Sequence, residues 1–229
     1  MKGLIYYIKG HAGSERQAEE ATESFRRRGW VTELVEGVTP DTIDEDEFPY
    51  PDLKGGRLES FRTSEPQKYL IKKSCIFNNL RHYKRVIKEN KPLAFIEHDA
   101  ICCGPPIIQY AMVPEYLCLT WEHALDQPVF AGRQDIRNYK HQDHLGYNPF
   151  PKDFPLVYYK DSIYRGAAMS PGTCAYIVSV KGAKKLLKAA MDNGLEQSDF
   201  HINSKNIEMG YVFPSPVKYN TNLNTSHNL

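Results

Sequence analysis

The sequence predicts an α/β domain with a mixed, mostly parallel sheet. The chain opens with a strand-loop-helix-strand pattern, the usual first unit of such a domain. The continuous apolar run Leu93–Ile96 is typical of a strand buried on both faces of a parallel sheet. Helical periodicity occupies much of the chain between these regions, as alternating strands and helices require. A length of 229 residues suffices for one sizeable domain.

The opening unit is defined by its apolar strands and its helix signals. Leu4–Ile8 is rich in branched and aromatic residues, which predicts a buried strand. Ser14 is predicted to begin a helix, with Gln17 completing a capping box, and Gly29 is predicted to end it. Trp30–Val35 is predicted to form the second strand.

An acidic stretch separates this unit from a helical region. Residues 36–56 contain several acids and three prolines, and a solvated loop explains them without any function. The sequence Ser64-Glu65-Pro66 is a good helix entry. Two helices are expected between this entry and Asn90, because Pro92 prevents continuation.

The second half of the chain has fewer regular patterns. The elements expected there are strands at Tyr116–Trp121, Cys174–Ser179 and Tyr211–Phe213, and helices at Lys181–Met191 and Asp199–Glu208. Residues 122–171 lack periodicity and are expected to form a long irregular loop of the kind that often carries function. Without repeats or linkers, we expect a single domain over residues 1–220 and a polar tail at 221–229.

Composition excludes several classes of protein. A hydrophobic content of 41% argues against disorder, and a net charge of +1 gives no overall attraction to nucleic acid or membranes. No apolar run reaches the roughly 18 residues of a membrane-spanning helix, and the apolar N-terminal segment is too short for a signal peptide. The five cysteines lack metal-ligand spacing and are expected to be reduced, buried thiols of a cytoplasmic protein.

Glu97, His98 and Asp99 directly follow the apolar run. Ligand sites of parallel sheets lie beyond the carboxyl ends of their strands, and carboxylates there suit Mg²⁺ or Mn²⁺. An added imidazole ligand would favour Mn²⁺. Side chains alternate along a strand, so Glu97 and Asp99 would share one face. His98 would then point away as a packing residue, unless the strand has already ended.

Three segments resemble family 25 glycosyltransferases, the lipopolysaccharide and collagen galactosyltransferase type. Phe95–Ala100 resembles the family's acidic motif, and Gly172–Ala183 resembles its segment of glycine-threonine, apolar strand and serine-x-lysine-glycine-alanine. The first strand followed by Ser14-Glu15-Arg16 resembles its donor-binding segment, and residues 74–80 match a family helix loosely. His98 replaces the middle acid of the motif, and residues 122–165 show no similarity.

The resemblance implies a GT-A fold and sugar transfer from a nucleotide diphosphate sugar, with Mn²⁺ or Mg²⁺ as cofactor and inversion at the sugar. Asp99 corresponds to the metal-binding acid of the motif, and Glu97 to a group that touches ribose or supports the ligands. By analogy with GT-A enzymes, His227 or His201 would be a second ligand. Each histidine is otherwise explained as a solvated surface residue.

The remaining site residues follow from position and resemblance. Asp199 stands where the family has an acid before a helix and could act as general base, although it would equally serve as an N-cap. Lys9 and Arg16 could hold the donor's phosphate or base, whereas Arg16 could also be an exposed helix charge. Gly172 and Thr173 would let the backbone approach the donor sugar, or simply form a turn.

The acceptor is open between two chemistries. Arg133, Arg137, Tyr139 and Lys140 lie in a stretch of basic residues and tyrosines. Such a stretch suits sugar rings, or a DNA backbone with a flipped hydroxymethylated base, an acceptor used by some phage glycosyltransferases. The low net charge weakens the DNA alternative. A phage-encoded protein would act in the host cytoplasm. A non-catalytic GT-A-like protein that binds a nucleotide or a partner is the competing functional class.

Overall fold

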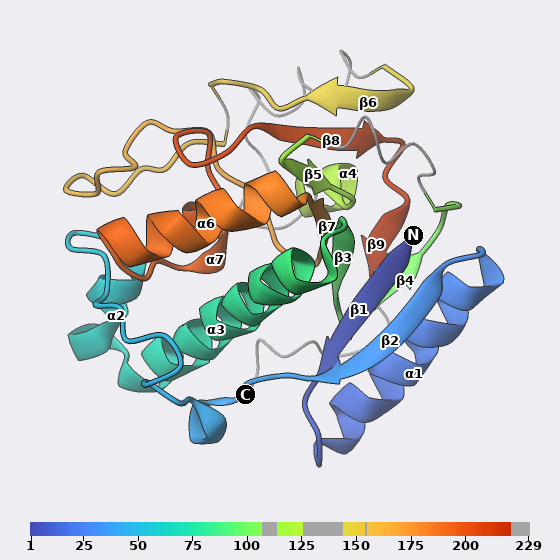
Figure 1. Cartoon of the computed structure of the whole chain (residues 1–229), viewed down its shortest axis with the longest axis horizontal. Coiled ribbons are helices and arrows are strands. Elements are labelled where there is room, and N and C mark those ends of the chain that lie inside the picture. The colour runs from blue at the N-terminus through green and yellow to red at the C-terminus, as the bar shows by residue number, and fades with distance from the viewer. Residues whose placement is uncertain (107–113, 126–143, 154, 221–229) are drawn as a thin grey trace.

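A seven-stranded mixed sheet runs through the centre of the computed structural model (Figure 1), which describes residues 1–106, 114–125, 144–153 and 155–220. The strands of this sheet, in spatial order, are β2 (Val31–Glu36), β1 (Lys2–Tyr7), β3 (Leu93–Glu97), β7 (Ala175–Val178), β5 (Tyr116–Cys118), β8 (Met209–Phe213) and β6 (Gly146–Pro149). A second, two-stranded sheet pairs β4 (Ala100–Cys102) with β9 (Val217–Tyr219).

The strand directions confirm a mixed, mostly parallel sheet. β1 is parallel to both β2 and β3, and β5 is parallel to β8. β7 runs antiparallel between β3 and β5, and β6 is antiparallel to β8. In the β3–β7 pair, Ile96 faces Ala175, so the end of β3 meets the beginning of β7. This pairing brings two segments far apart in the sequence to one edge of the sheet.

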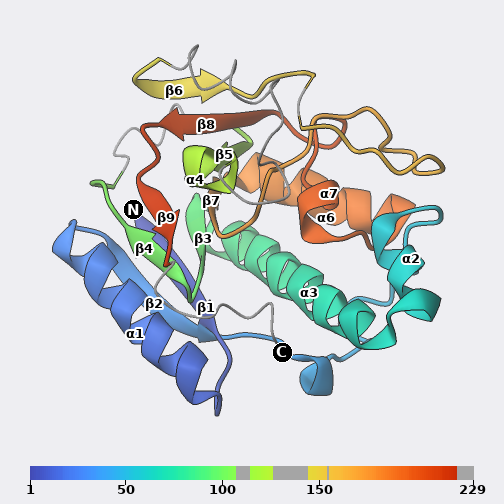
Figure 2. The same ribbon diagram turned by 180° about the vertical axis from the view of Figure 1, so that it is seen from behind.

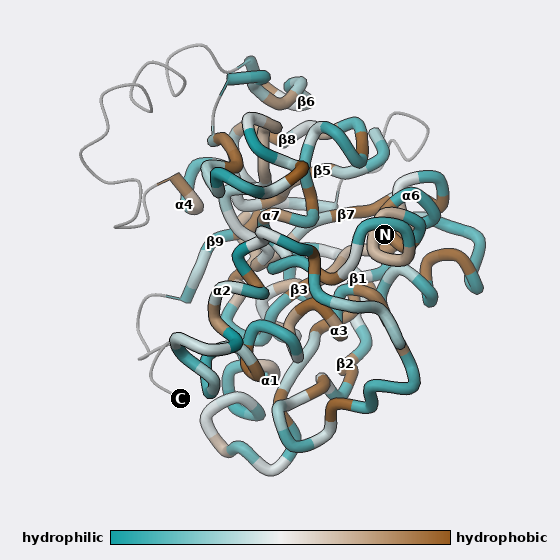
Figure 3. The backbone as a smooth tube through the Cα atoms, turned by 90° about the vertical axis from the view of Figure 1, so that its left-hand side faces the viewer, coloured by the Kyte–Doolittle hydropathy of each residue, from teal (hydrophilic) through white to brown (hydrophobic). Residues whose placement is uncertain are grey.

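Helices cover both faces of the sheet, giving an α/β domain compatible with a Rossmann-like fold. α1 (Ala12–Arg27) packs Ala18, Ala21 and Phe25 against one face. α3 (Pro66–Glu89) and α6 (Val180–Asn193) pack against the other (Figures 1 and 2). Alternate residues of the strands enter the two cores, as the pleat requires. Figure 3 shows the hydrophobic stretches along β1 and β7 that fill these cores.

Short elements complete the architecture. They are η1 (Pro40–Thr42), α2 (Arg57–Ser64), α4 (Trp121–Leu125) and α7 (Ser198–His201). α2 lies beside the start of α3 (Figure 2), and its first two backbone amides donate hydrogen bonds to the carboxylate of Glu196. The start of α7 contacts the middle of α3, where Asn79 Nδ2 donates to Ser198 Oγ at 3.1 Å. None of the helices in the described ranges is long and apolar enough to cross a membrane.

The first helix begins earlier than its capping pattern predicts. α1 starts at Ala12, and His11 is the N-cap, because its Nδ1 accepts a hydrogen bond from Ser14 N at 3.1 Å. Ser14 therefore lies inside the helix, and its Oγ accepts a hydrogen bond from Ile8 N at 2.9 Å. The capping-box prediction was wrong, but the serine still fixes the loop between β1 and α1.

Other boundaries also differ from the predictions. α3 is one unbroken helix with Glu65 at its N-cap, and the helix before it, α2, ends at Ser64. β5 ends at Cys118, and Trp121 begins α4 rather than ending a strand. The region expected to be an irregular loop contains β6, and the tail at 221–229 lies outside the described residues.

Candidate functional site

The candidate site lies where β3 ends, at the switch point of the sheet. From β1 the chain passes to β2 on one side and then returns to β3 on the other. The parallel strands β1 and β3 end side by side there, since Tyr6 pairs with Glu97 (Figure 1). Open α/β sheets bind their ligands outside the carboxyl ends of strands at such a point.

Glu97, Asp99 and Cys174 bring three potential metal ligands together at this edge. One ligand atom from each residue lies within 4.8 Å of the other two. The backbone sets the arrangement, because Glu97 N donates a hydrogen bond to Cys174 O at 2.7 Å. The Cys174 thiol lies 4.0 Å from Asp99 Oδ1. Asp99 O accepts a hydrogen bond from Asn220 N at 2.7 Å, which ties the turn after β3 to the end of β9.

Asp199 adds a third carboxylate from the short helix α7. Its side chain accepts a hydrogen bond from Gln197 Nε2 at 3.2 Å, and the residue is half-buried. The N-cap of α7 is Gln197, so Asp199 is not the cap that the sequence allowed. Thr173 stands between the acids: its hydroxyl lies 3.4 Å from Glu97 Oε1 and also interacts with Asp199.

The charges of this cluster disfavour full ionisation in the absence of a cation. Burial raises the pKa of Glu97, and the negative charges of Asp99 and Asp199 raise it further. Burial also raises the pKa of Asp199, whereas Lys72 on α3 opposes that rise. A divalent cation would relieve the crowding of like charge.

The ligand set fits such a cation. Two carboxylates and a thiol offer both hard oxygen ligands and one softer sulfur ligand. Oxygen ligands suit Mg²⁺ and Mn²⁺, and the sulfur shifts the preference away from Mg²⁺ toward Mn²⁺ or Zn²⁺. Burial and the neighbouring carboxylates raise the pKa of the Cys174 thiol, so the sulfur becomes a strong ligand only when a cation displaces its proton.

Gly172 lies in the turn before β7, and the side chain of Tyr219 packs closely against its backbone. A Cβ atom at this position would lie 2.6 Å from the hydroxyl of Tyr219, so any other residue would have to displace that ring. This contact places the Tyr219 hydroxyl beside the turn that leads to Cys174, and burial together with the nearby Cys174 and Glu97 raises the pKa of Tyr219. The Ser170 hydroxyl donates to Gly172 O at 2.6 Å and holds this turn.

The histidines do not join the described ligand group. β3 has already ended at Glu97, so His98 and Asp99 lie in a turn and the alternation expected along the strand does not apply to them. His98 interacts with the backbone of Tyr6, and burial lowers its pKa. The expectation for His201 is corrected: it is fully buried, and its Nε2 bonds Leu186 O at 3.0 Å beneath α6. Burial lowers the pKa of His201 to about 4. His227 lies outside the described residues.

The predicted donor and acceptor residues have different outcomes. Lys9 is exposed after β1 and forms an ion pair with Glu36 at 3.3 Å. Arg16 is exposed in the first turns of α1, so both residues lie at the switch-point edge without contacting the acid cluster in any described interaction. The acceptor-side residues Arg133, Arg137, Tyr139 and Lys140 lie outside the described residues.

The sequence did not identify Cys174 as a potential metal ligand, and it did not predict the positions of Lys72 and Tyr219. Cys174 follows Gly172 and Thr173, which were predicted to face the donor, but only the antiparallel pairing of β3 and β7 places its thiol beside Asp99. Lys72 lies on α3, and no local pattern distinguishes it from the other lysines of that helix.

Comparison with known proteins adds no relative: no family model and no curated protein matches this chain. What the site does must therefore follow from its own geometry and charge.

Proposed function

We propose that the protein is a metal-dependent glycosyltransferase with a GT-A-like fold. It would move a sugar from a nucleotide diphosphate sugar to an acceptor hydroxyl, with inversion at the sugar. The observation that carries this proposal is the convergence of Glu97, Asp99, Cys174 and Asp199 at the switch point of the sheet. Nucleotides bind at this position in related architectures.

The donor end of the site would be built on Asp99. Asp99 is the principal ligand in this proposal, with Glu97 and Cys174 completing the protein's share of the coordination. A bound Mn²⁺ or Mg²⁺ would supply Lewis-acid stabilisation of the negative charge that develops on the departing diphosphate. Lys9 and Arg16 would interact with the nucleotide from the β1–α1 side, where both side chains are exposed.

Asp199 would serve as the general base. Its carboxylate is oriented by Gln197 Nε2, and Lys72 favours its charged form against the effect of burial. A base of this kind removes the acceptor's proton while the acceptor oxygen attacks the sugar directly, so no covalent intermediate is needed. Direct displacement inverts the configuration of the sugar.

Donor binding and turnover test this proposal. The protein is titrated with UDP-glucose, UDP-galactose and GDP-mannose, with Mn²⁺ and with EDTA, and thermal unfolding is followed. At a ligand concentration about 100-fold above Kd, binding stabilises the folded state by about 2.7 kcal/mol. We expect one donor to raise the melting temperature in a Mn²⁺-dependent way and to be hydrolysed slowly. Binding without hydrolysis or transfer would instead identify a non-catalytic nucleotide-binding protein, and the absence of both would refute the proposal.

A further inference from the structure

An aromatic cluster lies directly beside the proposed base. Phe200, next to Asp199 in the sequence, is buried. The rings of Tyr158 and Tyr159 stack on each other at 4.9 Å, and each meets the Phe200 ring edge-on at 5.6 Å. The loop that carries the two tyrosines is thereby joined to α7.

Arg57 occupies the centre of this cluster. Its guanidinium carbon lies 5.2 Å from the ring centre of Phe200, 5.8 Å from that of Tyr159 and 6.0 Å from that of Tyr158. Nη1 donates a hydrogen bond to the Tyr158 hydroxyl, whereas Nε is buried without an acceptor among the described residues. The aromatic rings therefore supply most of the contacts of this cation.

The backbone fixes the cluster relative to Asp199. The fully buried Glu196 accepts hydrogen bonds from Arg57 N at 2.9 Å, Leu58 N at 2.8 Å and its own neighbour Gln197 N at 2.7 Å. The start of α2 is thus attached to the segment that carries the base. The positive charge of Arg57 also opposes the rise that burial causes in the pKa of Asp199.

The exposed part of the cluster is aromatic and nearly neutral. Tyr158 is 62% exposed, and Tyr159 is half-buried beside it. Tyr159 is followed by Lys160 and Asp161, which carry opposite charges, and the half-buried Arg57 cation packs against the rings. A phosphate backbone would require several accessible cations. A sugar ring, by contrast, offers a C–H face for stacking and hydroxyls for the phenol.

We infer that Tyr158, Tyr159 and Arg57 form the acceptor subsite and that its ligand is an uncharged saccharide. This inference rests on the proposed function for the role of Asp199, but the binding of a saccharide can be measured without catalysis. The exposed ring of Tyr158 stacks on the sugar, and Arg57 orients that ring through its hydroxyl.

Saturation-transfer NMR with methyl β-galactoside and methyl α-glucoside tests the subsite directly. We expect transfer from the wild-type protein to at least one glycoside, and loss of that transfer in Tyr158→Ala. Tyr158→Phe keeps the ring and should retain most of the signal. Tyr147→Ala removes a tyrosine on β6 that is 43% exposed and serves as the matched control. A wild-type protein that binds neither glycoside, or a Tyr158→Ala variant that binds both normally, would overturn the inference.

Transfer assays separate this inference from the proposed function. If the wild type uses the glycoside, KM for the glycoside should rise about tenfold in Tyr158→Ala, as expected for the loss of one stacked ring. Donor turnover with transfer only to an oligonucleotide that contains hydroxymethylcytosine would overturn the saccharide subsite while the glycosyltransferase proposal stands. Glycoside binding that depends on Tyr158, without any donor binding, would refute the glycosyltransferase and keep the saccharide site.

Discussion

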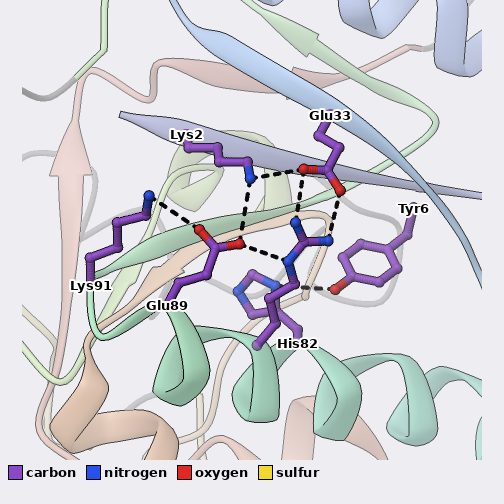
Figure 4. Close-up of polar contacts among 7 residues, drawn as sticks. Lys2, Tyr6, Glu33, His82, Glu89 and Lys91 are labelled. Atoms are coloured by element: carbon purple, nitrogen blue, oxygen red, sulfur yellow. Dashed lines mark hydrogen bonds and ion pairs between the residues drawn. The ribbon is translucent and has the colours of Figure 1, made fainter.

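Two charged regions at opposite ends of β1 and β3 are built in contrasting ways. At the start of the strands, acids and bases alternate in an ion-pair network (Figure 4). Its members are Lys2, Glu33, Arg85, Glu89 and Lys91. At the end of β3, by contrast, three acids converge: Glu97, Asp99 and Asp199. Among the described residues, the positive charge of Lys72 opposes the rise in the pKa of both Glu97 and Asp199.

The network at the start of the strands is closed by short, directed contacts. Arg85 binds both oxygens of Glu33, at 2.7 and 2.8 Å, and its Nε donates to Glu89 Oε1 at 2.8 Å. These hydrogen bonds lower the pKa of Glu33 and lower that of Glu89 to about 2. Beneath them the Tyr6 hydroxyl lies 3.3 Å from His82 Nδ1, and burial lowers the pKa of His82 to about 3.

The pKa values of the acids shift in opposite directions in the two regions. Glu33 and Glu89 are stabilised as carboxylates by neighbours within the fold, so this region needs no ligand. The pKa values of Glu97 and Asp199 are raised, so ionisation there opposes folding, and a bound cation would offset this cost. We therefore expect substitutions in the two regions to affect different properties of the protein.

The largest effect is expected from Asp99→Asn. The variant loses the main carboxylate of the proposed metal site, and several kcal/mol of transition-state stabilisation correspond to a loss of about 10³-fold in Mn²⁺-dependent donor hydrolysis. Glu33→Gln, at the other end of the sheet, is the control and should hydrolyse the donor normally. Steady-state kinetics of donor hydrolysis measure this loss. Full activity in Asp99→Asn would show that Asp99 is not a ligand of the proposed metal site.

Asp199→Asn should reduce transfer while leaving the donor bound. Loss of a general base lowers kcat by about 10²–10³-fold, whereas KM for the donor should change little because the ligand group around Asp99 remains. The variant is compared with wild type over a range of donor concentrations. An unchanged kcat would show that the contacts of Asp199 with Gln197 and Thr173 are structural and that Asp199 is not the base.

Glu89→Gln should change stability rather than activity. The folded pKa of Glu89 is depressed to about 2 from an ordinary 4.5, so its contribution is present above pH 4.5 and disappears as the pH falls through 2. Because the pair is partly screened by solvent, we expect a loss of about 1 kcal/mol at pH 7. Urea unfolding at pH 7 and pH 3 measures this difference, and an equal loss at both values would contradict the ionic explanation.

The smallest effect, and one of opposite sign, is expected from Glu97→Gln. Because the pKa of Glu97 is raised in the folded state, the wild type loses stability as the pH rises above the ordinary value of 4.5. The amide of the Glu97→Gln variant stays neutral, so the variant does not lose stability in this way. In EDTA the variant should gain up to about 1 kcal/mol at pH 8. Added Mn²⁺ should reverse the order by stabilising only the wild type. A loss of stability in EDTA would mean that Glu97 is satisfied within the fold.

The elements that could be predicted from the sequence depend on local patterns. The buried face of α1 and the strand before Glu97 follow directly from periodicity and apolar runs. The helix expected at residues 199–208 fails after His201, because Asn203 Nδ2 donates to Phe200 O at 2.7 Å and to His201 O at 3.2 Å. Such side-chain hydrogen bonds compete with the helix for its carbonyl groups. Propensity over a window of residues does not detect this competition.

By itself, the sequence determined that a buried strand leads into Glu97 and Asp99, because an apolar run and its flanking acids are local features. The tertiary structure alone decided which residues join them. The antiparallel pairing of β3 with β7 brings Cys174 to Asp99, and the attachment of α2 to Glu196 places Arg57 beside Phe200. It also buried His201 beneath α6. Strand pairing and burial depend on contacts between segments that are far apart in the sequence. A local sequence pattern does not show which distant segments will meet.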